Sequence, residues 1–174
     1  MKLTWFGGTT FRIHIGGWMI VVDPQGAPGS IDSTELVSGA DKIIELEGGL
    51  PQADPRKWMP RKVGALIDAA AALPEVLVHR LGEAVVLIEA VGEAPLVIAT
   101  GEVSEAGRWG RDAVVVIAGK DLPRTAVSVV NEIGPRLIAV AGGEHAIEET
   151  IEAVRELLDG TGLMAMEPAL ALEV

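Results

Sequence analysis

The sequence predicts a single α/β domain with a layered architecture, spanning residues 1–174. The length of 174 residues fits one domain of ordinary size. The first part of the chain shows the two-residue period of β-hairpins, and the last third alternates apolar strands with amphipathic helices. Hairpins followed by a β-α-β-α order favour sheets that are covered by helices.

Three strands are predicted at the start of the chain. Residues 2–6 form the first. Polar and apolar residues alternate strictly across 10–15, which directs a phenylalanine and two isoleucines toward a core. The Gly-Gly pair at 16–17 predicts a two-residue hairpin turn, and 18–22 returns as the partner strand.

The next segments are mostly irregular. Residues 24–39 are rich in Gly, Pro, Ser and Asp and predict a loop, and a short strand follows at 42–46. Three prolines and two glycines prevent regular structure over 47–60. Apolar residues then recur at helical spacing, which predicts an amphipathic helix over 61–73.

Buried strands and two helices account for the remainder. Proline suits the first turn of a helix, so Pro123 is expected to open a helix that runs to Ile133. A second helix is expected over 144–159, with Gly160 as its C-terminal cap. Further strands are expected at 76–79, 84–90, 96–100, 113–118, 137–141, 163–166 and 169–172.

Composition restricts the function classes. The net charge is −11, and an acidic surface repels phosphate backbones, so we expect no nucleic-acid partner. Cysteine is absent, which excludes disulfides, thiolate ligands and a cysteine nucleophile. No apolar run reaches the roughly 20 residues that span a bilayer, and we expect a cytoplasmic protein without a membrane partner. Mean hydropathy is high at +0.36, which favours buried strands and an oligomer interface.

The opening 24 residues, MKLTWFGGTTFRIHIGGWMIVVDP, resemble the start of metallo-β-lactamase-fold hydrolases, in the branch similar to ascorbate-6-phosphate lactonase. That branch has a Gly-His-Ser-Thr/Cys-Phe turn between two strands, where this chain reads GGTTF. Gly8 replaces the family's histidine. The resemblance implies a four-layer αββα sandwich, here shortened around 47–95.

The metal ligands of that family are not matched. The resemblance places the His-x-His-x-Asp-His motif near 47–52, which reads EGGLPQ. It places the family's last histidine at Gly142 or a neighbouring residue. Glu102 stands where the family has a metal-bridging aspartate. His145, near the last ligand, is the other candidate remnant. The resemblance therefore carries over no catalytic residue, metal or other cofactor, since a hydrolytic zinc site needs about three protein ligands.

The remaining histidines have ordinary explanations. His14 alternates with polar residues on a hairpin face, and His79 precedes Arg80 at the end of a strand. Both are expected on the surface. An enzyme with altered ligands, in which Glu102 and His145 act with Glu47 or Asp23, is the alternative.

Two short loops combine tryptophan with basic residues. Six of the 14 basic residues flank Trp58 or Trp109. In the family fold the two loops converge at the mouth of the cleft, so we predict a site for an anionic small molecule or an acidic partner there. The alternative is that each tryptophan covers a core edge among snorkelling arginines. The predicted ligand-binding residues are Arg56, Trp58, Arg61, Arg108, Trp109 and Arg111.

The leading hypothesis is a non-catalytic, metal-free member of this fold that acts as a ligand-binding or assembly module. We expect it to form a homo-oligomer or a complex with another protein. One form of such a complex would join this chain to an active homologue whose surface it completes.

Overall fold

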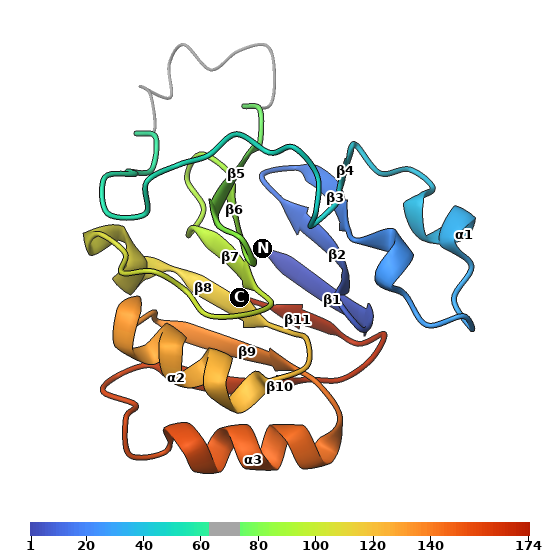
Figure 1. The fold of residues 1–174 in the computed structure, drawn as a ribbon. Coiled ribbons are helices and arrows are strands. Elements are labelled where there is room, and N and C mark those ends of the chain that lie inside the picture. Colours follow the sequence, from blue (N-terminus) through green and yellow to red (C-terminus); the bar gives the residue numbers. More distant parts are fainter. Residues whose placement is uncertain (63–73) are drawn as a thin grey trace.

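The computed structural model describes residues 1–62 and 74–174, and it contains two β-sheets packed face to face, with helices outside them (Figure 1). The α/β two-sheet architecture predicted from the sequence is confirmed. The helix predicted over 61–73 falls almost entirely outside the described residues. Its first two residues, Arg61 and Lys62, are not helical.

The first sheet has the strand order β11-β1-β2-β3-β4. Its strands are β1 (Lys2–Gly7), β2 (Thr10–Ile15), β3 (Trp18–Val22), β4 (Lys42–Ile44) and β11 (Ala171–Glu173). Gly16 and Gly17 both have positive φ, at 57° and 82°, as the predicted turn between β2 and β3 requires. Strand β11 comes from the far end of the chain and pairs antiparallel with β1, and the amino group of Met1 donates to the carbonyl of Val174 at 2.7 Å.

The second sheet has the order β10-β9-β8-β7-β6-β5. It contains β5 (Leu77–Gly82), β6 (Val85–Glu89), β7 (Leu96–Ala99), β8 (Val114–Ile117), β9 (Leu137–Ala141) and β10 (Gly162–Met166). Strands β7 to β10 are parallel. Every residue of β7 and β8 is buried, which explains their uninterrupted apolar sequences.

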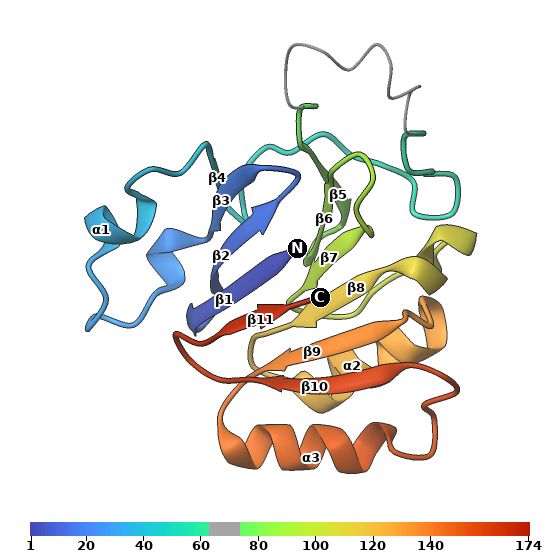
Figure 2. The ribbon, with the colours of Figure 1, turned by 180° about the vertical axis from the view of Figure 1, so that it is seen from behind.

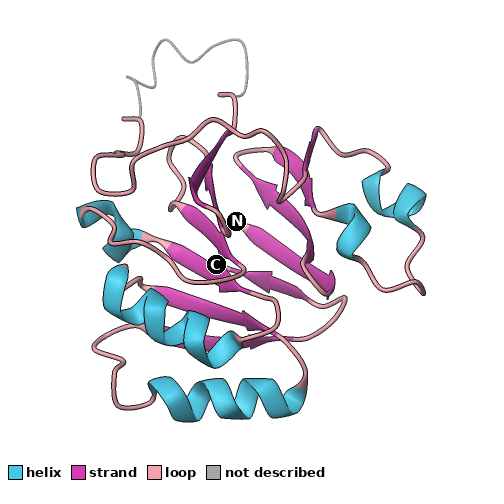
Figure 3. Ribbon diagram, viewed as in Figure 1, coloured by secondary structure: helices cyan, strands magenta, loops and turns pink. Residues whose placement is uncertain are grey.

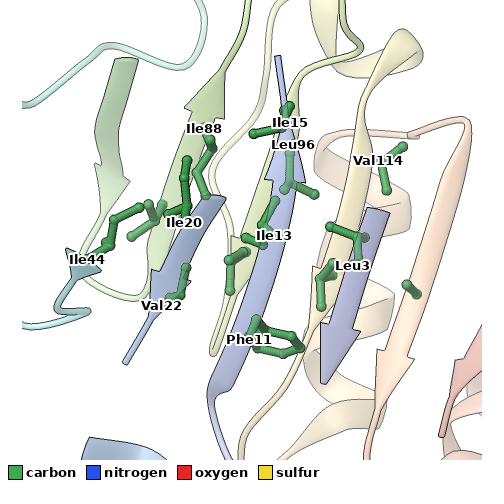
Figure 4. Close-up of a cluster of buried hydrophobic side chains, with 14 of the residues drawn as sticks. Leu3, Phe11, Ile13, Ile15, Ile20, Val22, Ile44, Ile88, Leu96 and Val114 are labelled. Atoms are coloured by element: carbon green, nitrogen blue, oxygen red, sulfur yellow. The ribbon is translucent and has the colours of Figure 1, made fainter. Parts of the chain in front are cut away.

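Two apolar clusters hold the layers together. The first lies between the sheets and includes Phe11, Ile13 and Leu96 (Figure 4). The second lies between the second sheet and the helices α2 (Leu122–Glu132) and α3 (Glu144–Val154). The view from behind shows both helices beside this sheet (Figure 2).

The segment predicted as a loop over 24–39 contains two short helices, so that prediction is wrong (Figure 3). They are the 3-10 turn η1 (Pro24–Gly26) and α1 (Ser33–Val37). Asp32 caps α1 by accepting from the N–H of Thr34 at 2.8 Å, a signal that is present in the sequence. Arg12 on the outer face of β2 donates to the carbonyl of Leu36 at 2.6 Å and so ties α1 to the first sheet.

Helix α3 ends earlier than predicted. Its last helical residue is Val154, and Arg155 rather than Gly160 forms the C-cap. The N–H of Leu158 then donates to the carbonyl of Val154 at 3.2 Å, and the leucine side chain packs on the second cluster. The predicted end was too late because Leu158, in the turn after the helix, also packs on this cluster and extends the apolar pattern in the sequence. Among the described residues, no helix has the length and apolar character needed to cross a membrane.

We predict that Ile13→Ala lowers the free energy of unfolding by about 2–5 kcal/mol, because it leaves a cavity between the sheets. Ile13 is 1% exposed. Ile43→Ala is the matched control, since Ile43 also lies on a strand but is 50% exposed. Urea titration of both variants tests this, and equal effects would contradict the position assigned to the core.

Candidate functional site

A hollow of about 480 Å³ opens at the edge of the sandwich where β3, β4 and β7 end. This is the edge at which the resemblance to metallo-β-lactamase-fold hydrolases places a cleft. The lining contains four carboxylates and neither lysine nor arginine, so it attracts cations and repels anionic substrates. Its residues are Thr9, Asp23, Gln25, Glu45, Leu46, Glu47, Glu83, Ala84, Val86 and Thr100.

Asp23 is held in place by its neighbours in this hollow. Its backbone is left-handed, with φ 47°. The hydroxyl of Thr9 donates to its Oδ2, and the hydroxyl of Thr10 donates to its backbone carbonyl at 2.6 Å. The N–H of Asp23 donates to the carbonyl of Ile44 at 2.7 Å. The hydrogen bonds thus fix both the carboxylate and the backbone of Asp23, the residue that follows β3.

Arg80 on β5 organises the loop after β4, where the family motif would lie. One guanidinium nitrogen, Nη2, donates to the carbonyls of Leu46 and Gly48, the latter at 2.9 Å, and Nη1 donates to the carbonyl of Glu83 at 2.9 Å. The backbone of Arg80 also pairs with this segment, because its N–H donates to Pro51 and its carbonyl accepts from Ala53. A positive charge therefore lies against the loop at which the resemblance places the metal-binding motif. This role of Arg80 was not predicted from the sequence, where its signal is a single arginine on a strand that follows a glycine-containing loop.

The position of the family's first histidine is closed by backbone. Gly8 has φ 53°, and a Cβ added to it would lie 2.3 Å from the carbonyl oxygen of Gly26. The carbonyl of Gly8 also accepts from the indole N–H of Trp5 at 3.0 Å. No side chain fits at position 8 without a backbone shift.

The two remnant candidates point elsewhere. Glu102 follows β7 and forms an ion pair with Arg124 of α2 at 2.8 Å, with both side chains mostly exposed. His145 is 85% exposed on α3, with its Nε2 3.4 Å from a carboxylate oxygen of Glu149. Neither lines the hollow that contains Asp23 and Glu47.

The residues present do not fit the metal that the resemblance implies. Zinc in such sites prefers imidazole nitrogens with a carboxylate, whereas this hollow offers only oxygen atoms. Within residues 1–62 and 74–174, no three His, Asp or Glu side chains lie close enough together to share an ion. The altered ligand set of Glu102, His145 and Glu47 or Asp23 is thus not assembled in this structure.

The two tryptophan loops do come together. The rings of Trp58 and Trp109 meet edge to face with centroids 4.9 Å apart, and the indole N–H of Trp109 donates to the carbonyl of Pro55 at 2.7 Å. Both rings pack on the second apolar cluster. The Trp58 loop begins at Asp54, whose carboxylate accepts from the N–H of Arg56, and this hydrogen bond lowers the pKa of Asp54 below its ordinary value.

The arginines around the tryptophans divide into two groups. Arg61 donates through its backbone N–H and its Nε to the carboxylate of Glu89, which is only 3% exposed. Arg56 pairs with Glu105 at 2.7 Å, with both side chains exposed. Arg108 and Arg111 are exposed in the 3-10 turn η2 (Arg108–Asp112) and have no ion pair among the described residues.

The tryptophan–arginine cluster and the hollow lie at opposite ends of the strands of the second sheet. The prediction that this cluster lies at the mouth of the cleft is therefore wrong. Strands β7 and β8 are parallel and in register, with Leu96 beside Val114. Thr100 follows the end of β7 and lines the hollow, whereas η2 precedes the start of β8. The loop between them crosses the sheet, which the order of residues in the sequence does not reveal.

The similarity of this chain to known proteins lies in its overall structure. No protein-family model matches the sequence, and no curated protein matches it. The chain is similar to Igni18, a metallo hydrolase from the archaeon Ignicoccus hospitalis, at 14% identity and TM-score 0.49, over 99% of this chain and 98% of that one. It is also similar to a structure from Thermotoga maritima, described as a zinc-dependent hydrolase of the metallo-β-lactamase superfamily, at 14% identity and TM-score 0.44, over 96% and 99% of the two chains. With identities and TM-scores this low, neither likeness assigns an activity or a residue role to this chain.

We predict that Gly8→Ala destabilises the fold by about 1–3 kcal/mol, because alanine is strained at this φ and its Cβ meets a carbonyl oxygen. Gly49→Ala is the control, since nothing lies within 4 Å of a Cβ at that position. Thermal and urea unfolding of both variants measure the difference. A Gly8→Ala protein as stable as the parent would show that position 8 can accept a side chain.

Proposed function

We propose that this chain is a non-catalytic protein with a metallo-β-lactamase-like fold that acts as an assembly and ligand-binding module. The guanidinium of Arg80 carries this proposal, because it occupies the loop that would supply metal ligands in a hydrolase of this fold. The hydrogen bonds that this guanidinium donates to the carbonyls of Leu46 and Gly48 hold the loop in place without a metal ion.

Closure at Gly8 supports the same proposal from the other side of the hollow. The turn between β1 and β2 packs against the carbonyl of Gly26 and leaves no room for an imidazole. Two of the segments that hold the metal in the family therefore have another structural role here. The alternative, a metal-dependent hydrolase with altered ligands, needs a rearrangement that brings Glu102 and His145 to the hollow lined by Asp23 and Glu47.

The proposal predicts that purified protein carries no stoichiometric zinc, iron or manganese and hydrolyses neither esters nor phosphodiesters. Elemental analysis by mass spectrometry, and activity assays before and after dialysis against each metal, measure this. A tightly held transition metal together with hydrolysis that a chelator abolishes would refute the proposal and establish the alternative.

The variant Arg80→Ala tests whether the guanidinium stabilises the loop that follows β4. We expect the free energy of unfolding to fall by about 1–3 kcal/mol, because charge-assisted hydrogen bonds to three backbone carbonyls, two of them partly buried, are lost. Arg124→Ala is the control, since its exposed pair with Glu102 is worth less than about 1 kcal/mol. Equal effects of the two changes would remove the observation on which the proposal depends.

For ligand binding we propose that Arg108 and Arg111 contact an anion, with the tryptophan pair as structural support. Both arginines line a shallow hollow of about 620 Å³ that also contains Glu105, Asn131 and Glu132. Arg56 and Arg61 are already paired with carboxylates, so the site that we propose is smaller than the six-residue set predicted from the sequence.

Pyrophosphate is a suitable probe, because guanidinium groups bind phosphate oxygens in pairs. We expect calorimetry to detect binding to the parent protein and a loss of at least about tenfold in affinity in Arg108→Glu/Arg111→Glu, which corresponds to about 1.4 kcal/mol. Lys120→Glu is the control, since it makes the same kind of charge reversal after β8, at the opposite edge of the sheet. Equal affinities for all three proteins, or no binding to the parent, would contradict the site.

A further inference from the structure

Strand β10 leaves one side of the second sheet open. It is the last strand in the order β10-β9-β8-β7-β6-β5 and pairs with β9 alone among the described strands. Figure 2 shows β10 at the border of the sheet, with β9 on one side of it. An unpaired edge offers a row of backbone donors and acceptors to another strand.

The direction of these backbone groups follows from one hydrogen bond. The N–H of Gly162 donates to the carbonyl of Arg136 at 2.9 Å, so Gly162 faces β9. Alternate residues of a parallel strand face the same neighbour, which assigns Met164 to the β9 side. Leu163 and Ala165 therefore direct their N–H and C=O groups outward.

The side chains of β10 do nothing to prevent pairing. Residues 160–166 carry no charge, although the whole chain has a net charge of −11. Met164 is 45% exposed and Ala165 is exposed. The strand contains none of the prolines, lysines or bulges that protect natural edge strands.

We propose that β10 pairs antiparallel with β10 of a second copy of this chain, about a two-fold axis at Met164. In this register Leu163 lies opposite Ala165 of the second copy, so the outward backbone groups of both residues are paired. The two Met164 side chains meet at the centre and bury their exposed surface. The inference rests on the assembly part of the proposed function.

Charge complementarity favours a second copy as the occupant. Leu137 and Met166 pack between the sheets, so alternation places the preceding Arg136 and the following Glu167 on the helix-covered face. In the proposed register, Glu167 of the second copy lies opposite Thr161, and Thr161 lies beside Arg136 of β9's N-terminal flank. Arg136 and Glu167 of the second copy are therefore two strand spacings apart, or about 10 Å. Their two long side chains can span this distance. Both residues are exposed and have no ion pair in the described part of the chain. The two-fold axis forms this Arg136–Glu167 pair twice.

A single cysteine at the axis tests the register, since the chain has none of its own. We predict that Met164→Cys forms a disulfide-linked dimer under mild oxidation, because directly opposed residues in an antiparallel pair bring their Cβ atoms within disulfide range. Met59→Cys is the control, since Met59 is 75% exposed and lies outside every strand. Equal cross-linking of the two variants would overturn the register.

A charge swap tests the Arg136–Glu167 pair in solution. Sedimentation equilibrium should show a dimer whose dissociation constant rises at least about tenfold in Arg136→Glu and in Glu167→Arg. The double variant should regain the affinity of the parent, and Arg155→Glu, an exposed reversal on another segment, should not weaken the dimer.

The outcomes separate this inference from the proposed function. A strictly monomeric parent would overturn both the pairing and the assembly role. A dimer that Met164→Cys does not cross-link and the charge swap does not affect would overturn the pairing alone. Metal content and hydrolysis, measured above, bear on the catalytic question and leave the dimer result standing.

Discussion

Burial of the second sheet on both faces is the constraint on which the rest of the molecule depends. Strands β7 and β8 pack against the first sheet on one side and against the second apolar cluster on the other, and all of their residues are buried. Polar groups can therefore gather only at the two ends of these strands. The acidic hollow lies at one end and the tryptophan–arginine cluster at the other, and the same sheet separates them.

Two segments that border the hollow are fixed by contacts within the chain itself. The turn at Gly8 and the loop at 46–53 are held by hydrogen bonds within the chain. A guanidinium resembles a metal ion in one respect, because it is a cation that several carbonyl oxygens can surround. It differs in having no vacant coordination position at which water could become a nucleophile.

The sequence predicted the strands well because their patterns are local. Alternation across 10–15 and apolar runs such as 113–118 correspond to β2 and β8, and the glycine turn at 16–17 was correct. The short helix α1 was missed because Gly, Pro and Ser around it outweighed the cap at Asp32. The site was harder to predict, since the ion pair of Arg61 with Glu89 and the clamp of Arg80 on Leu46 join residues 28 and 34 positions apart. Spacing along the chain contains no information about such contacts.

The pairing of β1 with β11 has a consequence for how the chain acquires its structure. Strand β1 is paired on one side with β11, which brings Lys2 opposite Glu173, a residue far away in the sequence. This side of β1 stays unpaired until β11 has been synthesised, so Leu3 lacks part of its final cover until then. Contacts of such long sequence separation slow folding, and the nascent chain exposes apolar strand surface in the meantime.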